Sequence, residues 1–522
     1  MTHTRSHEPA QVRRAPVDLP APYGDNNIER EPLWYAFGAG SDEPAVPPWT
    51  WVDQPPMTAH THPPPPSCAQ GGPCVELPRD THELLGRTPY PHGRAAVRDP
   101  DEALLRALVA GFGVQWSDPD AVYDPHRGYA SPRCLYPVQV FVDDGEQWHL
   151  LDPERHTLTV LTAGSHRGRQ RRIALTGRYT RIPSGYKWFR GSLVNLELGI
   201  VLRQLALALE LFGLSGRVVL PHGGSAAVLD ELGLTPGWEW SLPTVVEIGP
   251  EFPEPAPAAD APQPEEQPGK QPENQPADQP GEPALRDLVR VNRTQAFTDP
   301  PAPLPSAVPA HPVPGTGTAS WAELMWRRNS GRMPRGLLGM SGRRTRVPAG
   351  SVEDAVRWLD TPPPGPAIAA AADLVTLTAV TQDVAGLPDG IHRIRSGRAV
   401  QLSAGRTAAA RLEAEYGYGL STDAGCDIRN ASAIWFMSVK PRELFARLGA
   451  NGWSAAQYWC GWALHGLCLS TTAYGMFTRP VRAFNEIPVQ RILRLDPDEM
   501  IALAAIVGTP RYAAHGLLDI RV

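Results

Sequence analysis

Hydrophobic and polar positions along residues 84–250 follow patterns typical of alternating helices and strands. Apolar residues recur at helical spacing over 101–113, and they occur nearly all round the helix expected over 192–214, which is broken by Glu197, Arg203 and Glu210. The second run is too apolar for a surface helix, so we expect a long helix buried on most sides. The remaining patterns predict strands at 138–142, 217–220 and 243–248, a hairpin at 146–160 with a turn at 152–154, a basic turn-rich segment at 172–182 and a helix at 226–232.

Residues 316–522 repeat much of this order. Helical patterns occur at 322–328, 352–359, 453–467 and 489–495, and strand patterns at 374–380, 392–394, 400–402, 433–439 and 501–507. The glycine within 464–467 is expected to end the buried helix of this half, as Gly213 ends the first. We interpret the repeated order as an internal duplication.

Two stretches interrupt these patterns. The chain has 58 prolines, which concentrate in an irregular arm over residues 1–83 and a linker over residues 251–315 rich in Pro, Glu and Gln. Such a linker buries too little apolar surface to fold and is expected to be extended, apart from a short helical pattern at 284–297. The predicted organisation is therefore an arm, a domain over 84–250, the linker and a domain over 316–522.

Composition excludes several classes of protein. The net charge of −6 gives no reason to expect a nucleic-acid partner. The six cysteines form no zinc-like ligand set, and no run of 18 uncharged apolar residues is present to span a membrane. No dinucleotide-binding or nucleotide-phosphate glycine motif occurs either. We therefore expect a cytoplasmic protein with reduced thiols and no metal site.

Residues 127–137 lead directly into the first predicted strand with the sequence Arg-Gly-Tyr-Ala-Ser-Pro-Arg-Cys-Leu-Tyr-Pro. With the hairpin that follows, this stretch resembles the SagB-type branch of the FMN-dependent nitroreductase superfamily, in which a proline-serine loop ends in Leu-Tyr-Pro. Ser131 and the residues 135–137 match that loop. Ala130 stands where the family has proline, and Arg133 where it has glycine. Taken alone, the stretch is an ordinary junction between a loop and a strand.

The resemblance implies an α+β fold with two nitroreductase-like domains, each with a mostly antiparallel sheet flanked by helices. The two domains would form an intramolecular pseudo-dimer about the long buried helices. The family is dimeric, and each FMN lies at the dimer interface. One subunit supplies a phosphate-binding Arg-x-Ser-x-Arg element, and the other supplies the proline-serine loop.

The two elements of such a site are found in different domains of this chain. Arg328, Ser330 and Arg332 form the Arg-x-Ser-x-Arg pattern in the second domain, where two guanidinium groups and a hydroxyl suit a phosphate. The loop carrying Ser131, Pro132 and Arg133 is in the first domain. The resemblance therefore implies one FMN per chain. The alternative for the 328–332 pattern is solvated surface.

Further residues of the second domain match family positions. Gly475 and Met476 stand where backbone donors approach the flavin, although a plain turn is an equal alternative. Arg511, after the last predicted strand, is a candidate phosphate partner.

Tyr186 and Lys187 are the candidate catalytic residues, because azoline-oxidising members of the SagB-type group carry a Lys-Tyr pair before the long helix. A partly desolvated lysine can act as a base. The alternative is an exposed lysine at a helix start.

The resemblance implies an FMN-dependent dehydrogenase that oxidises thiazolines or oxazolines of a peptide substrate, together with a cyclodehydratase partner. Two alternatives stay open. One is an NAD(P)H-dependent reductase of the same fold acting on a nitro, quinone or dehydroamino-acid group. The other is a flavin-less scaffold that binds a partner.

Overall fold

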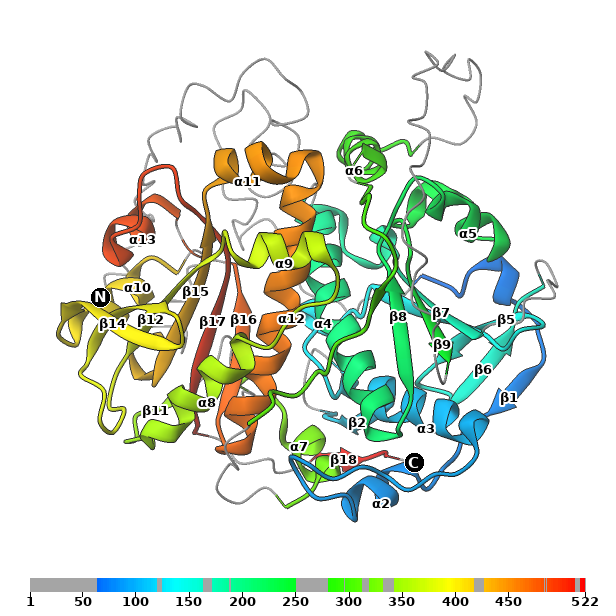
Figure 1. Ribbon diagram of the computed structural model, residues 1–522, viewed down its shortest axis with the longest axis horizontal. Coiled ribbons are helices and arrows are strands. Elements are labelled where there is room, and N and C mark those ends of the chain that lie inside the picture. The colour runs from blue at the N-terminus through cyan, green and yellow to red at the C-terminus, as the bar shows by residue number, and fades with distance from the viewer. Residues whose placement is uncertain are drawn as a thin grey trace, which may run out of the picture.

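The computed structural model describes residues 63–119, 124–162, 171–186, 189–249, 280–294, 296–311, 319–331, 342–416, 427–482, 484, 486–511 and 517–521. Figure 1 shows the first half, from blue to green, beside the second half, from yellow to red. Each half contains a sheet with helices packed against it. The chain is therefore an α+β protein built from two similar units.

The first half contains an eight-stranded sheet in the order β1-β6-β5-β4-β7-β9-β8-β10, and all of its pairings are antiparallel. Its strands are β1 (Cys74–Glu76), β4 (Val138–Asp143), β5 (Trp148–Asp152), β6 (Thr157–Val160), β7 (Arg171–Gly177), β8 (Ser215–Val219), β9 (Thr244–Gly249) and β10 (Ala302–Pro303). The segment over 172–182, expected to be turn-rich, contains the central strand β7. Its arginines lie at the start of the strand, where the Arg172 side chain pairs with Asp143 and Glu231, so the charges do not prevent a strand.

The second half contains a seven-stranded sheet. Its strands are β11 (Gly342–Arg343), β12 (Thr376–Thr381), β13 (Gly390–Arg395), β14 (Arg398–Ala404), β15 (Ala433–Val439), β16 (Phe477–Val481) and β17 (Met500–Pro510). The order β6-β5-β4-β7-β9-β8 of the first sheet recurs here as β14-β13-β12-β15-β17-β16. The two halves thus share one strand topology, as the internal duplication inferred from the sequence requires.

Two long helices lie side by side between the sheets, α4 (Phe189–Leu211) and α12 (Gly452–Ala473) (Figure 1). α4 is long and apolar enough to cross a membrane by length and composition, but 94% of its most apolar window is buried inside the protein. Its nearly uniform apolar sequence follows from this position, because both halves of the chain cover it.

The second long helix does not end within 464–467, as expected, but continues to Ala473. A glycine inside a buried helix face need not end the helix, and Gly466 leaves space for the Arg203 side chain of α4 instead. The true stop is Gly475, with φ +71°, and its counterpart in the first half is Gly213, with φ +70°. These glycines are separated by the same 262 residues that separate the paired side chains Asn195 and Gln457.

The remaining helices cover the sheets or connect the halves. They are α2 (Thr81–Gly86), α3 (Pro100–Phe112), α5 (Ser225–Glu231), α6 (Pro283–Thr294), α7 (Trp321–Arg327), α8 (Ala349–Leu359), α9 (Pro366–Ala372), α10 (Thr407–Ala414), α11 (Pro441–Leu448) and α13 (Glu486–Leu493). The amphipathic patterns over 101–113 and 284–297 correctly predicted α3 and α6. Asp99 caps α3 by accepting a hydrogen bond from the backbone of Asp101.

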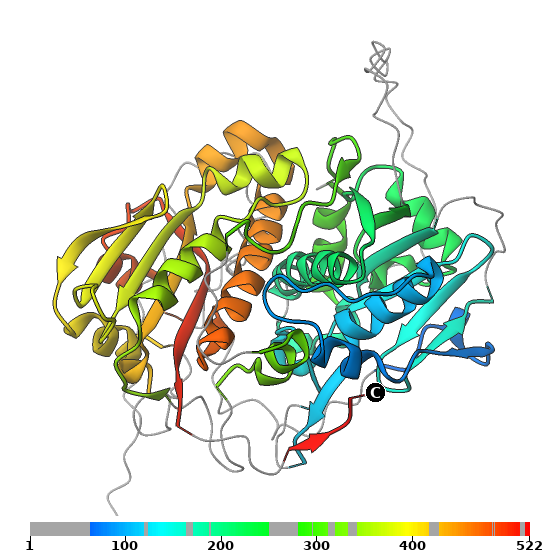
Figure 2. The same cartoon turned by 60° about the horizontal axis from the view of Figure 1, so that its bottom comes forward.

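The second half and the linker also contribute strands to the first half. The C-terminal strand β18 (Leu518–Asp519) pairs with β2 (Val114–Ser117) of the first half, which pairs in turn with β3 (His126–Arg127). Figure 2 shows this red strand beside the blue strand of the first half. The part of the expected linker over 296–311 is also not extended away from the protein. Phe297 and Ala307 are buried, and β10 joins the edge of the first sheet.

Candidate functional site

The Arg328 side chain joins the two halves of the protein at the loop that the sequence singled out. α7 is capped by the Ser320 hydroxyl and ends at Arg327, so Arg328 begins an extended segment. Arg328 as a whole is 3% exposed, and its guanidinium donates hydrogen bonds to the Arg127 carbonyl (3.0 Å) and the Ser330 hydroxyl (3.4 Å). The structure therefore brings Arg328 and Ser330 against the 127–137 stretch. Arg332 lies outside the described residues.

One nitrogen of this guanidinium has an unfilled hydrogen-bonding position. Arg328 Nε is buried and has no hydrogen-bond partner in the described part of the chain, and the same is true of Arg127 Nε. Buried donors without an acceptor are uncommon in folded proteins and are often found where a ligand supplies the missing acceptor. Arg328 also pairs with no carboxylate among the described residues. This chemistry fits an anionic or acceptor-rich group.

Ser131 is held by a buried carboxylate of the long helix α4. Its hydroxyl donates to Glu197 Oε2 (2.5 Å) and accepts from the Tyr136 backbone (2.9 Å), while Glu197 Oε1 accepts from the Val138 backbone (3.3 Å). Burial raises the pKa of Glu197 to about 7, although the hydrogen bonds from Ser131 and Val138 act to lower it. Glu197 therefore fixes the proline-serine loop to the helix interface.

A continuous set of hydrogen bonds connects this loop to Arg328. The Tyr136 hydroxyl accepts from the Arg127 backbone (2.9 Å), and the Arg127 guanidinium lies 4.1 Å from the centre of the Tyr136 ring. Arg127 also donates to the Tyr129 hydroxyl (3.2 Å) and accepts from Arg328. Sequence reasoning did not single out Arg127, Tyr129 or Glu197 as site residues. The available signal was a glutamate within an almost wholly apolar helix.

The loop contains residues in the left-handed backbone region. Arg133 has φ +50°, Cys134 has +52° and Tyr136 has +46°. A side chain in this region is disfavoured by roughly 1–2 kcal/mol, so glycine would be favoured over arginine at position 133. Burial raises the pKa of Cys134 to about 11, although the nearby charge of Arg328 acts to lower it. The thiol is therefore protonated at neutral pH.

The structure also brings Tyr186 to the same loop. The Arg133 guanidinium lies 5.0 Å from the centre of the Tyr186 ring, and that ring stacks on Phe189 at the start of α4, with a centroid distance of 6.5 Å. Lys187, the other candidate catalytic residue, lies outside the described residues. Tyr186 and Arg133 thus form a half-buried pair beside Pro132.

The backbone donors of Gly475 and Met476 are occupied. Gly475 N donates to Thr472 O (2.9 Å) and Met476 N donates to Thr471 O (3.0 Å), which is the hydrogen-bond pattern of a Schellman helix cap. Gly213 and Leu214 make the same bonds at the end of α4. The hydrogen bonds of Gly475 are therefore those of a plain turn at the end of a helix.

The Arg511 side chain also has partners within the protein, and none of them belongs to the Arg328 segment. Its guanidinium lies 3.3 Å from the Asp427 carboxylate and donates to Gly342 O (3.4 Å), and almost half of its side chain is exposed. In the ranges that the structure describes, no hydrogen bond connects it to the Arg328 segment.

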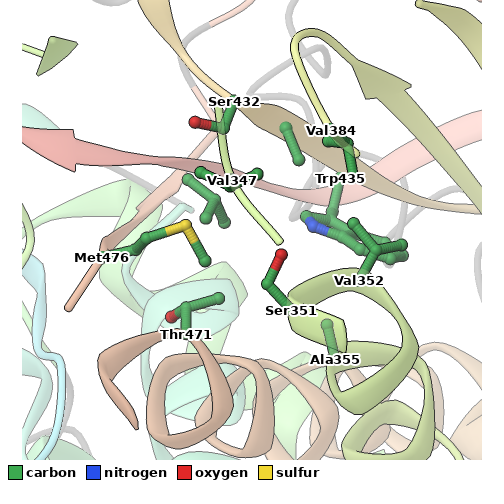
Figure 3. A pocket seen from close by; sticks show the side chains of 11 residues that line it. Val347, Ser351, Val352, Ala355, Val384, Ser432, Trp435, Thr471 and Met476 are labelled. Carbon is green, nitrogen blue, oxygen red and sulfur yellow. The ribbon is translucent and has the colours of Figure 1, made fainter. Parts of the chain in front are cut away.

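A small apolar pocket lies beside Met476. Figure 3 shows Met476 and Thr471 facing Val347 and Ser351 across it. Its volume is about 10 Å³, which is the space of roughly one water molecule. This pocket is too small for a cofactor ring and is separate from the Arg328 contacts.

The position equivalent to the Arg328 segment in the first half is filled by the chain itself. In the second half, Thr478 N on β16 donates to Asn329 O (3.2 Å). Equivalent positions in the two halves are 262 residues apart, so Thr478 corresponds to Gly216 on β8. The carbonyl oxygen of Gly216 accepts a hydrogen bond from the backbone N–H of Leu304 (2.8 Å). Residues 302–304 of the linker thus lie along β8 as the Arg328 segment lies along β16. The two halves therefore do not offer equal sites.

Comparison with solved structures identifies the fold. A protein assigned as a nitroreductase, from Anabaena variabilis, matches over 92% of this chain and 99% of its own, with a TM-score of 0.64 and 14% sequence identity. The chain thus has the nitroreductase fold across both halves, as the sequence predicted.

Two further structures match a smaller part of the chain. They are the Escherichia coli microcin synthetase McbBCD complex with truncated pro-MccB17 bound (TM-score 0.29, 13% identity, 35% of this chain and 71% of that chain) and a protein assigned as a nitroreductase from Ralstonia eutropha (0.24, 12%, 37% and 83%). Their TM-scores are too low to carry an argument. No protein-family model and no curated protein sequence matches the chain.

Proposed function

We propose that the protein is an FMN-dependent oxidoreductase that holds one FMN per chain, between the Arg328 segment of the second half and the 127–137 loop of the first. The observation that carries this proposal is the Arg328 guanidinium, which is buried against Arg127 and has an unpartnered Nε. A nitroreductase fold with an acceptor-seeking arginine at the contact between its halves suits a flavin better than a purely structural role.

Different residues of this contact would bind different parts of the FMN. Arg328, Ser330 and Arg332 would hold the phosphate and the polar edge of the cofactor by charge-assisted hydrogen bonds. Ser131, Pro132 and Arg133 would lie beside the ring, with the loop kept in place by Glu197. When bound, FMN would supply two-electron redox chemistry. The linker segment beside β8 takes the equivalent place in the other half, which supports a single cofactor.

The resemblance to SagB-type dehydrogenases suggests the substrate class. We infer oxidation of thiazoline or oxazoline rings in a peptide to thiazoles or oxazoles, in the cytoplasm and in cooperation with a cyclodehydratase. Either Lys187 or Tyr186 would act as the base that accepts the one proton that leaves the ring. Gly475, Met476 and Arg511 have a smaller part in this proposal, because their donors have partners within the protein.

The first test is the flavin content of the purified protein, measured by absorbance after release and compared with the chain concentration. We expect one FMN per chain in the wild type and at least a tenfold weaker FMN affinity in Arg328→Ala, because a charge-assisted hydrogen bond contributes about 1.5–3 kcal/mol. Arg327→Ala is the matched control, since that neighbouring side chain is half exposed and pairs with Glu323.

The outcomes separate the alternatives. Two FMN per chain would mean that the first half has a site of its own and that the linker segment does not replace it. A chain that takes up no FMN would favour the scaffold role. Bleaching of the bound flavin by NADPH would indicate a reductase instead of a dehydrogenase.

A further inference from the structure

The hydrogen bond between Ser131 and Glu197 can run in either direction, depending on one proton. The Ser131 hydroxyl lies 2.5 Å from Glu197 Oε2 and accepts a hydrogen bond from the Tyr136 backbone (2.9 Å). Glu197 Oε1 accepts from the Val138 backbone (3.3 Å). A hydroxyl has one proton and two lone pairs, and a carboxyl donates only when it is protonated. The protonation of Glu197 therefore decides which of the two side chains is the donor.

The two states leave the Ser131 proton in different places. An ionised Glu197 can only accept, so the Ser131 hydroxyl donates to it. In a neutral Glu197, Oε1 is occupied by the Val138 N–H, so Oε2 carries the proton and donates to Ser131. The Ser131 oxygen then accepts from both Glu197 and Tyr136, and its own proton is released to a third partner. Ser131 is half-buried whereas Glu197 is buried, so this proton can reach a group outside the helix interface.

The surroundings of Glu197 allow both states near neutral pH. Burial raises its pKa to about 7, while Arg127 and Arg181 act in the opposite direction, and neither is ion-paired with the carboxylate in the described part of the chain. Tyr129 also acts on this site and is a neutral phenol, because burial raises its pKa to about 12. The helices α3 and α12, which pack on α4 as well, contribute none of the main groups that shift the pKa of Glu197.

We propose that Glu197 is a positioning residue that directs the Ser131 hydroxyl, so that the neutral carboxyl frees this hydroxyl to donate to FMN and the ionised carboxyl withholds it. This inference rests on the proposed function, which places Ser131 beside the flavin ring. It adds a coupling that the fold does not specify. Glu197 would hold its proton more tightly when FMN is bound, so the affinity for FMN depends on pH.

The test measures the dissociation constant of FMN for the full chain, freed of bound flavin, between pH 6 and pH 9 by quenching of flavin fluorescence. We expect the wild-type affinity to fall about three- to tenfold relative to Glu197→Gln across this range, because one hydrogen bond to the cofactor is lost. Glu197→Gln should bind tightly at every pH, since its amide N–H donates to Ser131 as a protonated carboxyl does. The FMN phosphate titrates with both proteins, so the comparison between them isolates Glu197.

Glu210→Gln is the matched control. Glu210 lies on the same helix and also accepts hydrogen bonds from a serine hydroxyl, that of Ser306 (2.9 Å), and from a backbone N–H, that of Ala307 (3.2 Å). Unlike Glu197, it is partly exposed and pairs with Arg94. Glu210→Gln should therefore retain the wild-type dependence on pH.

Ser131→Ala tests the hydroxyl itself. It should bind FMN at pH 6 about as weakly as the wild type does at pH 9, and it should lose the pH dependence that distinguishes the wild type from Glu197→Gln. Parallel profiles for the wild type and Glu197→Gln, or a wild-type profile that survives in Ser131→Ala, would overturn the proposal while leaving the flavin assignment intact. A wild-type chain that binds no FMN would overturn both.

Discussion

Gly199 and Gly461 face each other's helix at the centre of the protein. A Cβ atom on Gly199 would lie 2.1 Å from the carbonyl oxygen of Tyr458, and one on Gly461 would lie 2.0 Å from that of Leu196. The contact is reciprocal, since each glycine admits the backbone of the other long helix. It defines a pseudo-twofold arrangement in which α4 and α12 are equivalent, as expected for a duplicated chain.

The first prediction follows from this contact. Gly461→Ala is expected to lower the free energy of unfolding by about 3 kcal/mol or more, because the added methyl group meets backbone atoms that cannot move independently. Urea denaturation would measure the change. Gly111→Ala on α3 is the control, because its Cβ would meet Ala208 at an ordinary 3.4 Å and alanine favours a helix. Similar values for the two variants would contradict the prediction.

Much of the fold could be predicted because apolar periodicity reports burial directly. The run over 192–214 predicted α4 to within a few residues at each end, and the pattern at 284–297 predicted α6. The end of α12 was predicted wrongly, because a glycine needed for packing, Gly466, resembles one needed for termination. The distinction depends on Arg203, which lies far away in the sequence.

The candidate site was less accessible to sequence reasoning. The pattern at 328–332 and the loop at 127–137 could be identified, and the structure places Arg328 against Arg127. The role of Glu197 could not, because a carboxylate in an apolar run has no local partner in the sequence. The packing of the linker beside β8 was also missed, since its many prolines indicate an extended chain whether that chain is free or packed at a sheet edge.

The second prediction concerns the backbone at Arg133. Arg133→Gly is expected to be more stable than Arg133→Ala by about 1 kcal/mol, because both remove the side chain and only glycine relieves the positive φ. Thermal and urea unfolding of the pair would measure the difference. At Arg155, which has no positive φ, the order should be reversed, since glycine there only adds entropy to the unfolded chain. An alanine variant at position 133 that equals the glycine variant would contradict the assigned strain.

The third prediction concerns Arg203, a buried cation that fixes the linker to both long helices. Its guanidinium donates to the carbonyls of Ala307, Trp358 and Trp462 at 2.9–3.1 Å and forms no ion pair with a described carboxylate. Arg203→Lys is expected to lower the free energy of unfolding by about 3 kcal/mol, because a single ammonium cannot reach all three acceptors.

Amide hydrogen exchange should show the local consequence of this change. We expect faster exchange over residues 302–307 in Arg203→Lys, since the linker loses the hydrogen bonds to Ala307. Arg217→Lys, which alters a partly exposed pair with Glu247, should change stability by less than about 1 kcal/mol. Unchanged exchange at 302–307 would mean that Arg203 does not hold the linker.

The fourth prediction concerns the pH dependence that Glu197 introduces. Burial raises the pKa of its carboxyl from 4.5 to about 7, against the lowering influence of Ser131, Arg127 and Arg181. Between these two pH values the folded protein binds more protons than the unfolded chain. Its free energy of unfolding should therefore fall as pH rises from 4.5 to 7 and level off above 7, a loss on the order of 3 kcal/mol.

Glu197→Gln removes this titration while keeping the shape of the side chain. Urea unfolding at half-unit intervals between pH 4.5 and 8 should show the wild-type decline flattened in Glu197→Gln. Glu231→Gln is the control, since Glu231 is more exposed and pairs with Arg172 at 2.9 Å, and it should leave the decline between pH 5.5 and 7 unchanged. Parallel curves for the wild type and Glu197→Gln would show that the buried carboxyl stays ionised, stabilised by Arg127 and Arg181. Its hydrogen bond to Ser131 would then position the loop without depending on pH in this range.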